Sequence, residues 1–274
     1  MTASAPILSP ESEMWLRLGC FAGVLLACLL AEWLWPRRRE RRSWSRLTTN
    51  LALVIVNSLL LRLLLPVLAV GMAVIASERG WGLFNLFSLP LWLELALAVL
   101  LLDLAIYWQH RLFHLQPLFW RLHRVHHCDL QIDTTTGLRF HPLEILISMG
   151  IKFAVVIALG AAPLAVLVFE VLLNAGSLFN HANLAIPQPV DRWLRWLVVT
   201  PDMHRVHHSW HRQETDSNFS FCFPWWDHLF GSYQAQPADG HSDMTIGLHG
   251  FRDAREQRLD RLLLQPVRRG SDCV

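Results

Sequence analysis

Long apolar runs alternate with polar segments along the chain, and the runs predict membrane helices. Residues 14–35, 51–76 and 89–108 each form a run of the length that crosses a bilayer as a helix. A fourth run, 143–179, is too long for one crossing and is broken by Gly-Ala-Ala-Pro at 160–163. Because Gly and Pro interrupt helices, this run predicts a helical hairpin that either crosses the membrane fully or dips in and returns.

The composition also indicates a membrane protein. Of the 274 residues, 53% are hydrophobic and 17% are charged, and the mean hydropathy is +0.31. These values lie outside the usual range of soluble globular proteins. We therefore predict an all-α integral membrane protein with three transmembrane helices plus a helical hairpin, capped by histidine-rich helices. The five cysteines form no CxxC pair or regular framework, so we expect them to be reduced.

Arginines determine the predicted orientation in the membrane. Six of them crowd the segment after the first apolar run, namely Arg37, Arg38, Arg39, Arg41, Arg42 and Arg46. Such a cluster could contact nucleic acid, but directly after an apolar run it is typical of a cytoplasmic flank. The turn at 77–80 carries one arginine and residues 1–13 carry no basic residue, which predicts that both lie outside. Every histidine-rich segment then falls on the cytoplasmic side, and we expect no nucleic-acid partner.

The chain is predicted to divide into three parts. Residues 1–108 are membrane anchor helices, 109–251 are a catalytic domain that includes the membrane hairpin 143–180, and 252–274 are a C-terminal tail with a short surface helix. The N-terminal segment lacks the basic region and cleavage site of a signal peptide, so we expect the first run to remain as an anchor. A bacterial inner membrane fits better than the endoplasmic reticulum.

Charged residues inside the apolar runs are expected to pair, because an isolated charge in a bilayer is expensive. Lys152 and Glu170 are equally distant from Ala161, the middle of the hairpin turn. Antiparallel helices place them at the same depth, so we predict an ion pair between them. Arg62 and Glu94 could match in the same way.

The most informative pattern is a repeated histidine box. The pentapeptide His-Arg-Val-His-His occurs at 123–127 and again at 204–208, and His110 and His114 stand upstream. Positions i, i+3 and i+4 share one face of a helix, so each box presents neighbouring imidazoles, which are common ligands for iron, zinc, copper and nickel. Eight such ligands are too many for one ion of four to six coordination and suit two ions.

Several classes of metal protein fit this pattern poorly. A zincin requires HExxH with a glutamate base, but Arg111 occupies that position, and Arg124 and Arg205 cannot act as bases. Transporters place ligands near the bilayer midplane, whereas these boxes begin where the apolar runs end. Soluble di-iron bundles use Glu-x-x-His pairs, which the boxes lack. A non-enzymatic metal-binding protein remains an alternative, although a flexible histidine-rich tract would be its usual mark.

Motifs across residues 100–233 resemble the fatty acid hydroxylase/sterol desaturase superfamily in order and spacing. The matching motifs are Asp103 with Tyr-Trp-Gln-His-Arg-Leu-Phe-His at 107–114, Trp-Arg-Leu-His-Arg-Val-His-His at 120–127, Arg-Phe-His-Pro-Leu-Glu at 139–144, Asn-His-Ala-Asn at 180–183, Asp-Met-His-Arg-Val-His-His at 202–208, and Asn-Phe at 218–219 followed by Trp-Trp-Asp-His-Leu-Phe-Gly-Ser-Tyr at 225–233. The first hundred residues match only as a membrane anchor.

The resemblance implies a non-haem di-iron oxygenase that uses O2 to hydroxylate a lipid C–H bond, with desaturation or ether-lipid cleavage as alternatives. By motif, the implied ligands of the two irons are His110, His114, His123, His126, His127, His204, His207 and His208, with His181 as a ninth. His141 is a further possibility. Some members have a second histidine near His181, where this chain has Asn183, and His211 could substitute. The chemistry is coherent, because redox-inert zinc cannot activate O2.

Such a centre needs supporting residues and an electron source. Ligand histidines require their second nitrogen to be held by carboxylates or carbonyls, for which the candidates are Asp103, Asp133, Glu144, Asp202 and Asp227, with Asp202 also expected to cap a helix. The chain has no Gly-x-Gly-x-x-Gly, no cysteine set for an iron–sulfur cluster and no His-Pro-Gly-Gly haem motif. We therefore expect a separate reductase, ferredoxin or cytochrome to dock on the cytoplasmic face, near the arginines of 37–46 or 252–269.

Overall fold

The computed structural model describes residues 9–40, 43–87 and 89–269, and within these ranges the chain forms helices and loops without a strand. The longer helices are α1 (Pro10–Leu34), α2 (Trp44–Leu64), α3 (Ala69–Glu78), α4 (Leu91–Leu115), α5 (Pro117–His127), α6 (Pro142–Leu159) and α7 (Pro163–Asn180). The shorter helices are η1 (Leu83–Leu86), η2 (Thr134–Leu138), α8 (Gln188–Leu194), α9 (Pro201–His207), α10 (Arg212–Thr215), α11 (Trp225–Phe230), α12 (Gly240–Asp243), η3 (Ala254–Gln257), α13 (Leu259–Leu264) and η4 (Gln265–Val267).

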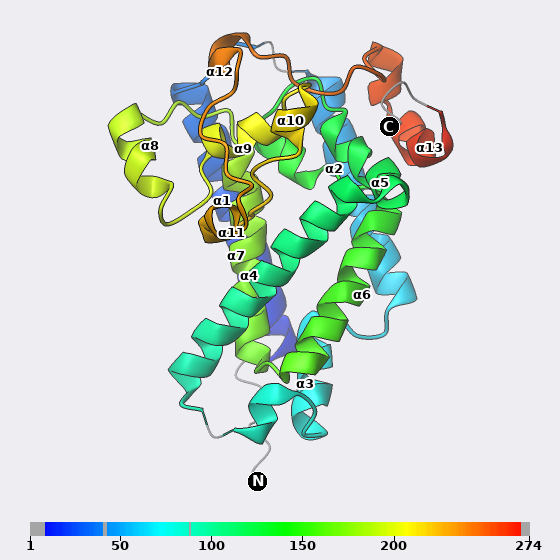
Figure 1. Ribbon diagram of the computed structural model, residues 1–274. Coiled ribbons are helices and arrows are strands. Elements are labelled where there is room, and N and C mark those ends of the chain that lie inside the picture. The colour runs from blue at the N-terminus through cyan, green and yellow to red at the C-terminus, as the bar shows by residue number, and fades with distance from the viewer. Residues whose placement is uncertain (1–8, 41–42, 88, 270–274) are drawn as a thin grey trace.

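Five stretches of helix are long and apolar enough to cross a membrane, which confirms a multi-pass membrane protein. In Figure 1 they form an elongated bundle in which α1 rises from the lower end, α2 descends, α4 rises, α6 descends and α7 rises again. The shorter helices that follow α7 gather at the upper end. The fold is therefore a membrane bundle with a cap built from short helices.

The helix boundaries follow from local sequence signals, with two departures from prediction. The apolar run 51–76 is two helices, α2 and α3, because Pro66 disfavours helical backbone at the residue before it and lacks an N–H donor. The run predicted to end at Trp108 continues as helix to Leu115. His110 and His114 consequently lie on the last turns of a membrane helix, and the cap begins only after them.

The predicted hairpin between α6 and α7 is confirmed. Helix α6 ends at Gly160 in the left-handed conformation (φ 64°, ψ 36°), and Pro163 starts α7 at its first turn. Gly82, also at positive φ, packs against this turn so closely that a Cβ there would lie 2.1 Å from Gly160 N. Only glycine fits at this contact between the α3–η1 loop and the hairpin.

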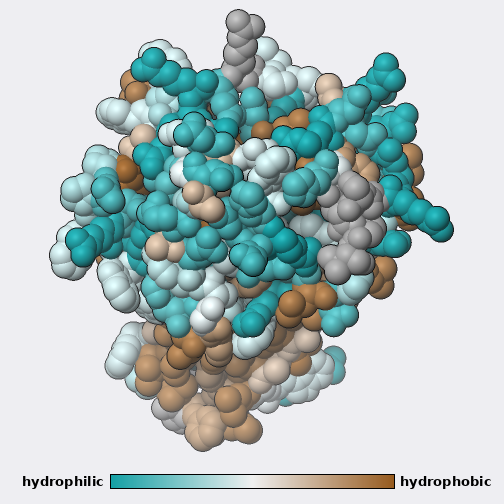
Figure 2. All heavy atoms as spheres, turned by 45° about the horizontal axis from the view of Figure 1, so that its top comes forward, coloured by the Kyte–Doolittle hydropathy of each residue, from teal (hydrophilic) through white to brown (hydrophobic). Residues whose placement is uncertain are grey.

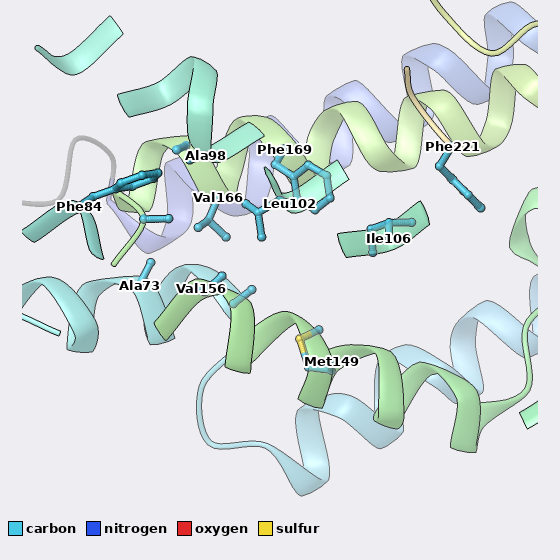
Figure 3. Packing of buried hydrophobic residues seen from close by; sticks show 13 residues of the cluster. Ala73, Phe84, Ala98, Leu102, Ile106, Met149, Val156, Val166, Phe169 and Phe221 are labelled. Atoms are coloured by element: carbon cyan, nitrogen blue, oxygen red, sulfur yellow. The ribbon is translucent and has the colours of Figure 1, made fainter. Parts of the chain in front are cut away.

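The main apolar core joins α3, α4, α6 and α7. Its fully buried members include Ala98 and Leu102 on α4, Val156 on α6, and Val166 and Phe169 on α7. Figure 3 shows these side chains converging between the helices, with Met149 of α6 facing Ile106 of α4. Small residues on α3 and α4 let the helices approach closely, which is how membrane helices generally pack.

The predicted ion pair inside the bundle is confirmed, with an addition. Lys152 Nζ lies 2.7 Å from Glu170 Oε1, and Arg17 of α1 donates to Glu170 Oε2 at 2.7 Å. Arg17 also pairs with Glu13 at 2.8 Å, so the four charges sum to zero. The proposed match of Arg62 with Glu94 is wrong, because Glu94 instead accepts a hydrogen bond from Ala162 N at the hairpin turn.

Polar and apolar surfaces separate along the bundle axis. Figure 2, in which the upper end of Figure 1 comes forward, shows hydrophilic residues over that end and hydrophobic residues on the bundle beyond it. The free state predicted for the cysteines is confirmed for Cys20, Cys28, Cys128 and Cys222, while Cys273 lies outside the described residues. Arg41 and Arg42 of the arginine cluster and the tail beyond 269 also lie outside them.

The arrangement generates a labelling prediction. In a chain carrying Cys20→Ser and Cys273→Ser, which keeps only the buried Cys28, Cys128 and Cys222, a cysteine introduced at exposed Ser45 or Gln213 should react with an impermeant maleimide from one side of the membrane. A cysteine at exposed Ser77 should react from the opposite side, because α2 and α3 separate it from Ser45. Labelling of Ser45→Cys and Gln213→Cys from opposite sides would contradict this bundle.

Candidate metal centre

Nine buried histidines meet where α4, α5, α7 and α9 come together at the cap. His110 and His114 come from α4, while His181 and His208 directly follow α7 and α9. Helix α5 contributes His123, His126 and His127, and α9 contributes His204 and His207. Every one is at most 4% exposed. The structure thus brings together all nine residues that the histidine boxes and the family resemblance indicated.

The nine imidazoles separate into two groups. One consists of His110, His114, His123, His127 and His207, and the other of His126, His181, His204 and His208. Within each group the possible ligand nitrogens lie within 4.8 Å of one another. Helix α5 serves both, because His126 and His127 are adjacent in sequence and point into different groups. Two neighbouring metal ions are what such an arrangement can accommodate.

Backbone carbonyls hold the outer nitrogens of several rings. The Nδ1 atoms of His110, His181 and His207 donate to Phe219 O, Ser177 O and Ser217 O at 2.7–2.8 Å, and His126 Nδ1 donates to Arg139 O at 3.2 Å. A carbonyl can only accept, so Nδ1 must carry the proton in each of these rings. Their Nε2 atoms are therefore unprotonated and carry lone pairs directed into the groups.

The facing nitrogens identify the chemistry that the groups can hold. His110 Nε2 lies 3.1 Å from His123 Nε2, and His181 Nε2 lies 3.1 Å from both His126 Nε2 and His204 Nε2. The Nδ1 atoms of His110, His126 and His181 are the protonated ones, and so is His123 Nδ1, which faces Glu144. In the His110–His123 and His126–His181 pairs, lone pairs thus face one another without a proton to share, an arrangement that a cation stabilises. The residues fit two metal ions bound through imidazole.

Other ring nitrogens agree with this interpretation. Both nitrogens of His127 and His208 and the Nε2 atoms of His114 and His207 are buried and have no hydrogen-bond partner among the described residues. Leaving a buried polar atom unpaired costs about 1–3 kcal/mol each. A metal ion would satisfy several of them at once.

Burial keeps the cap histidines neutral, the form that binds metal. Burial, reinforced by the imidazole of His123, lowers the pKa of His207 to about 3, and burial lowers the pKa of His181 to about 4. Burial and the adjacent imidazoles also hold the pKa of His126, His127, His204 and His208 well below the usual value. These rings are consequently neutral at neutral pH, so each has one nitrogen free of a proton.

Of the five acidic residues considered from the sequence, Glu144 alone contacts a ring of the two groups. Its Oε1 lies 2.7 Å from His123 Nδ1. Asp103 accepts hydrogen bonds from Cys222 N and Phe223 N, and Asp227 from Phe219 N and Ser220 N. Both carboxylates therefore shape the 219–223 segment, whose Phe219 carbonyl holds His110.

The other two candidates act at a greater distance from the histidines. Asp133 pairs with Arg46, and Asp202 pairs with Arg205 and Arg37. The expectation that Asp202 caps a helix is wrong, because the Thr200 hydroxyl accepts from Met203 N and caps α9. Sequence reasoning also missed Asp216, which contacts His114 Nδ1 at 3.3 Å.

The arginines of the repeated box have structural roles that the sequence did not reveal. Arg124 is fully buried and donates to the carbonyls of Gln265 and Arg268, tying α5 to the C-terminal segment. Arg205 is equally buried and donates to Ala182 O, next to His181. Each repeat thus supplies ligand candidates and an arginine that links its helix to another segment.

The C-terminal helix α13 is not wholly on the surface as predicted. Its Leu262 is fully buried, so one face of this helix packs against the cap.

The remaining histidines stay outside both groups. His141 is the N-cap of α6 and its Nε2 donates to Leu263 O, which removes it as a ligand candidate. His211 is a surface residue paired with Asp239, so it cannot substitute near His181. His228 and His249 stack on Trp196 and Trp210. His241 is 6% exposed and lies 3.9 Å from Asp202, so it is buried rather than a surface residue.

Comparison with known proteins identifies the family. The family model described as fatty acid hydroxylase matches residues 95–232, which contain every histidine of the two groups. The chain belongs to the fatty acid hydroxylase family. The resemblance drawn from the motifs is thereby confirmed. No solved structure shows a significant match to this chain.

Relatives of this fatty acid hydroxylase carry the names of enzymes that act on lipids or on very-long-chain aldehydes. The chain is 28% identical to the ornithine lipid hydroxylase OlsE of Rhizobium tropici over 159 residues, covering 57% of this chain and 46% of that protein. It is 29% identical to the alkylglycerol monooxygenase of Homo sapiens over 183 residues, covering 65% and 39%. A very-long-chain aldehyde decarbonylase, GL1-4 of Oryza sativa subsp. indica, is 24% identical over 271 residues, covering 80% and 42%. The chain spans less than half the length of these relatives.

The contact between Glu144 and His123 generates a test of the five-histidine group. Glu144→Leu removes the acceptor of His123 Nδ1, and we expect metal affinity to fall roughly 10–100-fold, the usual effect of losing such a partner. Glu144→Gln should lose less, because its amide oxygen still accepts. Competition with a chromogenic chelator measures both, with exposed Glu78→Gln as the control. Unchanged affinity in Glu144→Leu would show that this contact does not support a metal.

Proposed function

We propose that this protein is an O2-dependent, non-haem di-iron oxygenase that hydroxylates a C–H bond of a membrane lipid. The observation that carries the proposal is that each buried histidine group contains two unprotonated Nε2 atoms that face each other at 3.1 Å, His110 with His123 in one group and His126 with His181 in the other. Membership in the fatty acid hydroxylase family and the names of the relatives support a lipid substrate and oxygen chemistry.

All nine histidines are assigned as ligands in this proposal, five to one iron and four to the other. When bound, the irons would supply the activation of O2 that attack on an unactivated C–H bond requires. The protein holds the rings neutral, directs their Nε2 atoms inward and shields the centre from bulk water by burial. Residues 109–251 would form the catalytic domain, with 1–108 as the anchor and 252–274 as a tail packed on the cap.

A cavity beside the histidines supports lipid access. Its volume is about 440 Å³, and it lies among α1, α2, α4, α6 and α7 within the bundle. His110 and His123 line it, and so do Phe113, Phe140 and Phe221. A substrate in this cavity would reach the five-histidine group without leaving the membrane. Ether-lipid oxidation or desaturation would use the same site, because the product depends on which carbon rests beside the centre.

The iron content and its dependence on each group can be measured. Purified from iron-replete cells, the protein should hold about two irons per chain, as nine imidazoles in two groups require. His126→Ala and His207→Ala each remove a ligand from a different group and should each abolish lipid oxidation while membrane insertion persists. His249→Ala, outside both groups, should retain two irons and activity. A single metal per chain in the unsubstituted protein would exclude the di-iron centre, and metal binding without O2 consumption would favour a metal-binding protein.

The electrons are proposed to come from a separate reductase, ferredoxin or cytochrome on the cytoplasmic face, which is the side that the arginine-rich flank predicts for the cap. Of the arginine cluster, Arg37, Arg38 and Arg46 are engaged in contacts with Asp202, Glu40 and Asp129. Arg39 and, in the C-terminal segment, Arg255 and Arg261 remain exposed. These exposed arginines are the better candidates for meeting an acidic partner.

This electron requirement has a direct test. The iron-loaded protein with lipid, O2 and NAD(P)H should be inactive until an electron-transfer protein is added, because the chain carries no motif for a flavin, haem or iron–sulfur cluster. The rate should then fall as salt rises, since salt screens the contact. A chemical reductant serves as the positive control. Sustained turnover on NAD(P)H alone would contradict the proposal.

A further inference from the structure

Helix α8 turns its charged side toward the protein and its apolar side outward. Asp191 and Arg195 are buried and pair with each other at 2.5 Å. Arg195 also donates to Ala235 O at 2.7 Å, which fixes this side of the helix against the cap. The outward side carries Trp193, which is 76% exposed, and Leu197 of the following turn, which is 62% exposed. A surface helix of a soluble protein has the reverse arrangement, with its apolar stripe facing the core.

Helix α11 extends this outward apolar surface. Trp225 Nε1 donates to Trp196 O at 2.7 Å, and the His228 ring stacks on the Trp196 ring with centroids 5.2 Å apart. Trp225 and Leu229 are four residues apart and therefore share one side of α11. We call the joined surface the α8–α11 patch. Its members are 40–76% exposed and consist of Val190, Trp193, Trp196, Leu197, Trp225 and Leu229.

The chain that leads into α8 is attached to the point where α1 ends. Ala185 N donates to Trp35 O at 2.9 Å, and Arg37 N donates to Asn183 O at 3.0 Å. Trp35 directly follows the apolar helix α1 and precedes the arginine-rich segment, so it marks the boundary between hydrocarbon and water. Helix α8 begins three residues after Ala185. In Figure 1 it accordingly lies at the side of the bundle near the upper end of α1, below α12.

The patch also continues onto the outer side of a membrane helix. Phe230 of α11 packs against Trp108 of α4, with ring centroids 4.8 Å apart. Trp108 is 46% exposed, and α4 is long and apolar enough to cross a membrane. A bilayer that surrounds α4 at the depth of Trp108 therefore also reaches α11. Tryptophan is enriched at this depth in membrane proteins, because its ring is apolar and its N–H is polar.

We propose that the α8–α11 patch lies in the interfacial layer of the bilayer on the side of the cap, with Trp193, Leu197 and Leu229 among the acyl chains. Exposed Arg192 then meets the lipid head groups. Tryptophan and leucine on the outward side, with an arginine at its edge, are typical of a helix that lies in the interface instead of crossing it. Helix α9 begins soon after the patch, at Pro201, so the bilayer holds the part of the cap that carries the second histidine box. The proposal does not depend on the oxygenase function.

Fluorescence quenching measures what covers the patch. The fluorophore NBD is attached to one introduced cysteine at a time, in the cysteine background used above for maleimide labelling. The full-length protein is placed in phosphatidylcholine nanodiscs with one chain per disc. A phosphatidylcholine that carries a nitroxide near the start of its acyl chain should quench NBD at Trp193→Cys and Leu229→Cys several-fold more than at Gln213→Cys, an exposed cap position. Aqueous iodide should give the opposite order, and Leu59→Cys on the outward side of α2 is the control for full lipid contact.

Discs that hold two chains distinguish the bilayer from a second copy of the protein. Lipid quenching at Trp193→Cys should be the same with one chain and with two. Loss of this quenching in two-chain discs would show that a second copy covers the patch, and would overturn the proposal. Stronger quenching by iodide than by the nitroxide lipid in one-chain discs would leave the patch to water or to another protein, and would overturn it as well.

A matched pair of variants tests Trp193 with the label at Leu197→Cys. Trp193→Phe keeps an apolar ring and should retain lipid quenching at position 197. Trp193→Glu places a charge among the acyl chains and should lower that quenching several-fold. The exposed position of Trp193 means that neither variant removes a core contact. Equal quenching in the two variants would contradict a role for Trp193 in holding α8 in the interface, and the measurements at Trp193→Cys and Leu229→Cys stand apart from this pair.

Discussion

The fold depends on how it satisfies nine buried imidazoles. Backbone carbonyls and two carboxylates take up the outer nitrogens of most of these rings, which fixes the tautomers and leaves unprotonated nitrogens facing inward. Lone pairs at 3.1 Å repel unless a cation lies among them. Protein groups alone therefore do not satisfy these inward-facing nitrogens. We expect metal binding to stabilise the folded cap.

The membrane bundle and the cap are joined through the site. Helix α4 passes through the apolar core at Leu102 and ends in the first histidine pair, so packing in the bundle sets the position of His110. Helix α6 carries Glu144 near the cap and Lys152 two turns further into the bundle. The same helix therefore supports His123 through Glu144 and lines the cavity. A shift of α6 would change the cavity and the five-histidine group together.

Sequence patterns predicted the parts of this structure that depend on periodicity and composition. Apolar runs located the membrane helices, Gly160 and Pro163 located the hairpin, and symmetry about Ala161 located the partner of Lys152. Pro66 was a visible signal that the second run is two helices, although the hydropathy alone did not separate them. Eight of the nine histidines were recognisable because they stand in boxes with helical spacing, and His181 was recognisable through the family resemblance.

The supporting contacts were not predictable in the same way, because they depend on which loops fold over the site. Four of the outer ring nitrogens donate to main-chain carbonyls, and every non-terminal residue has a carbonyl, so sequence carries no mark of which ones are used. Of five plausible acidic residues one contacts a ring, while Asp216 was overlooked because it lies outside the motifs. Asp103 and Asp227 act indirectly, by fixing the backbone that presents Phe219 O to His110.

The two copies of the His-Arg-Val-His-His box show why an identical sequence can serve different positions. In the first copy the outermost histidines, His123 and His127, enter the five-membered group and His126 enters the other. In the second copy His204 and His208 enter the four-membered group and His207 enters the five-membered one. Each copy therefore contributes histidines to both groups, and the assignment of its three histidines is reversed between the copies. Neither helix can move without disturbing both groups, so loss of one histidine is expected to affect both groups.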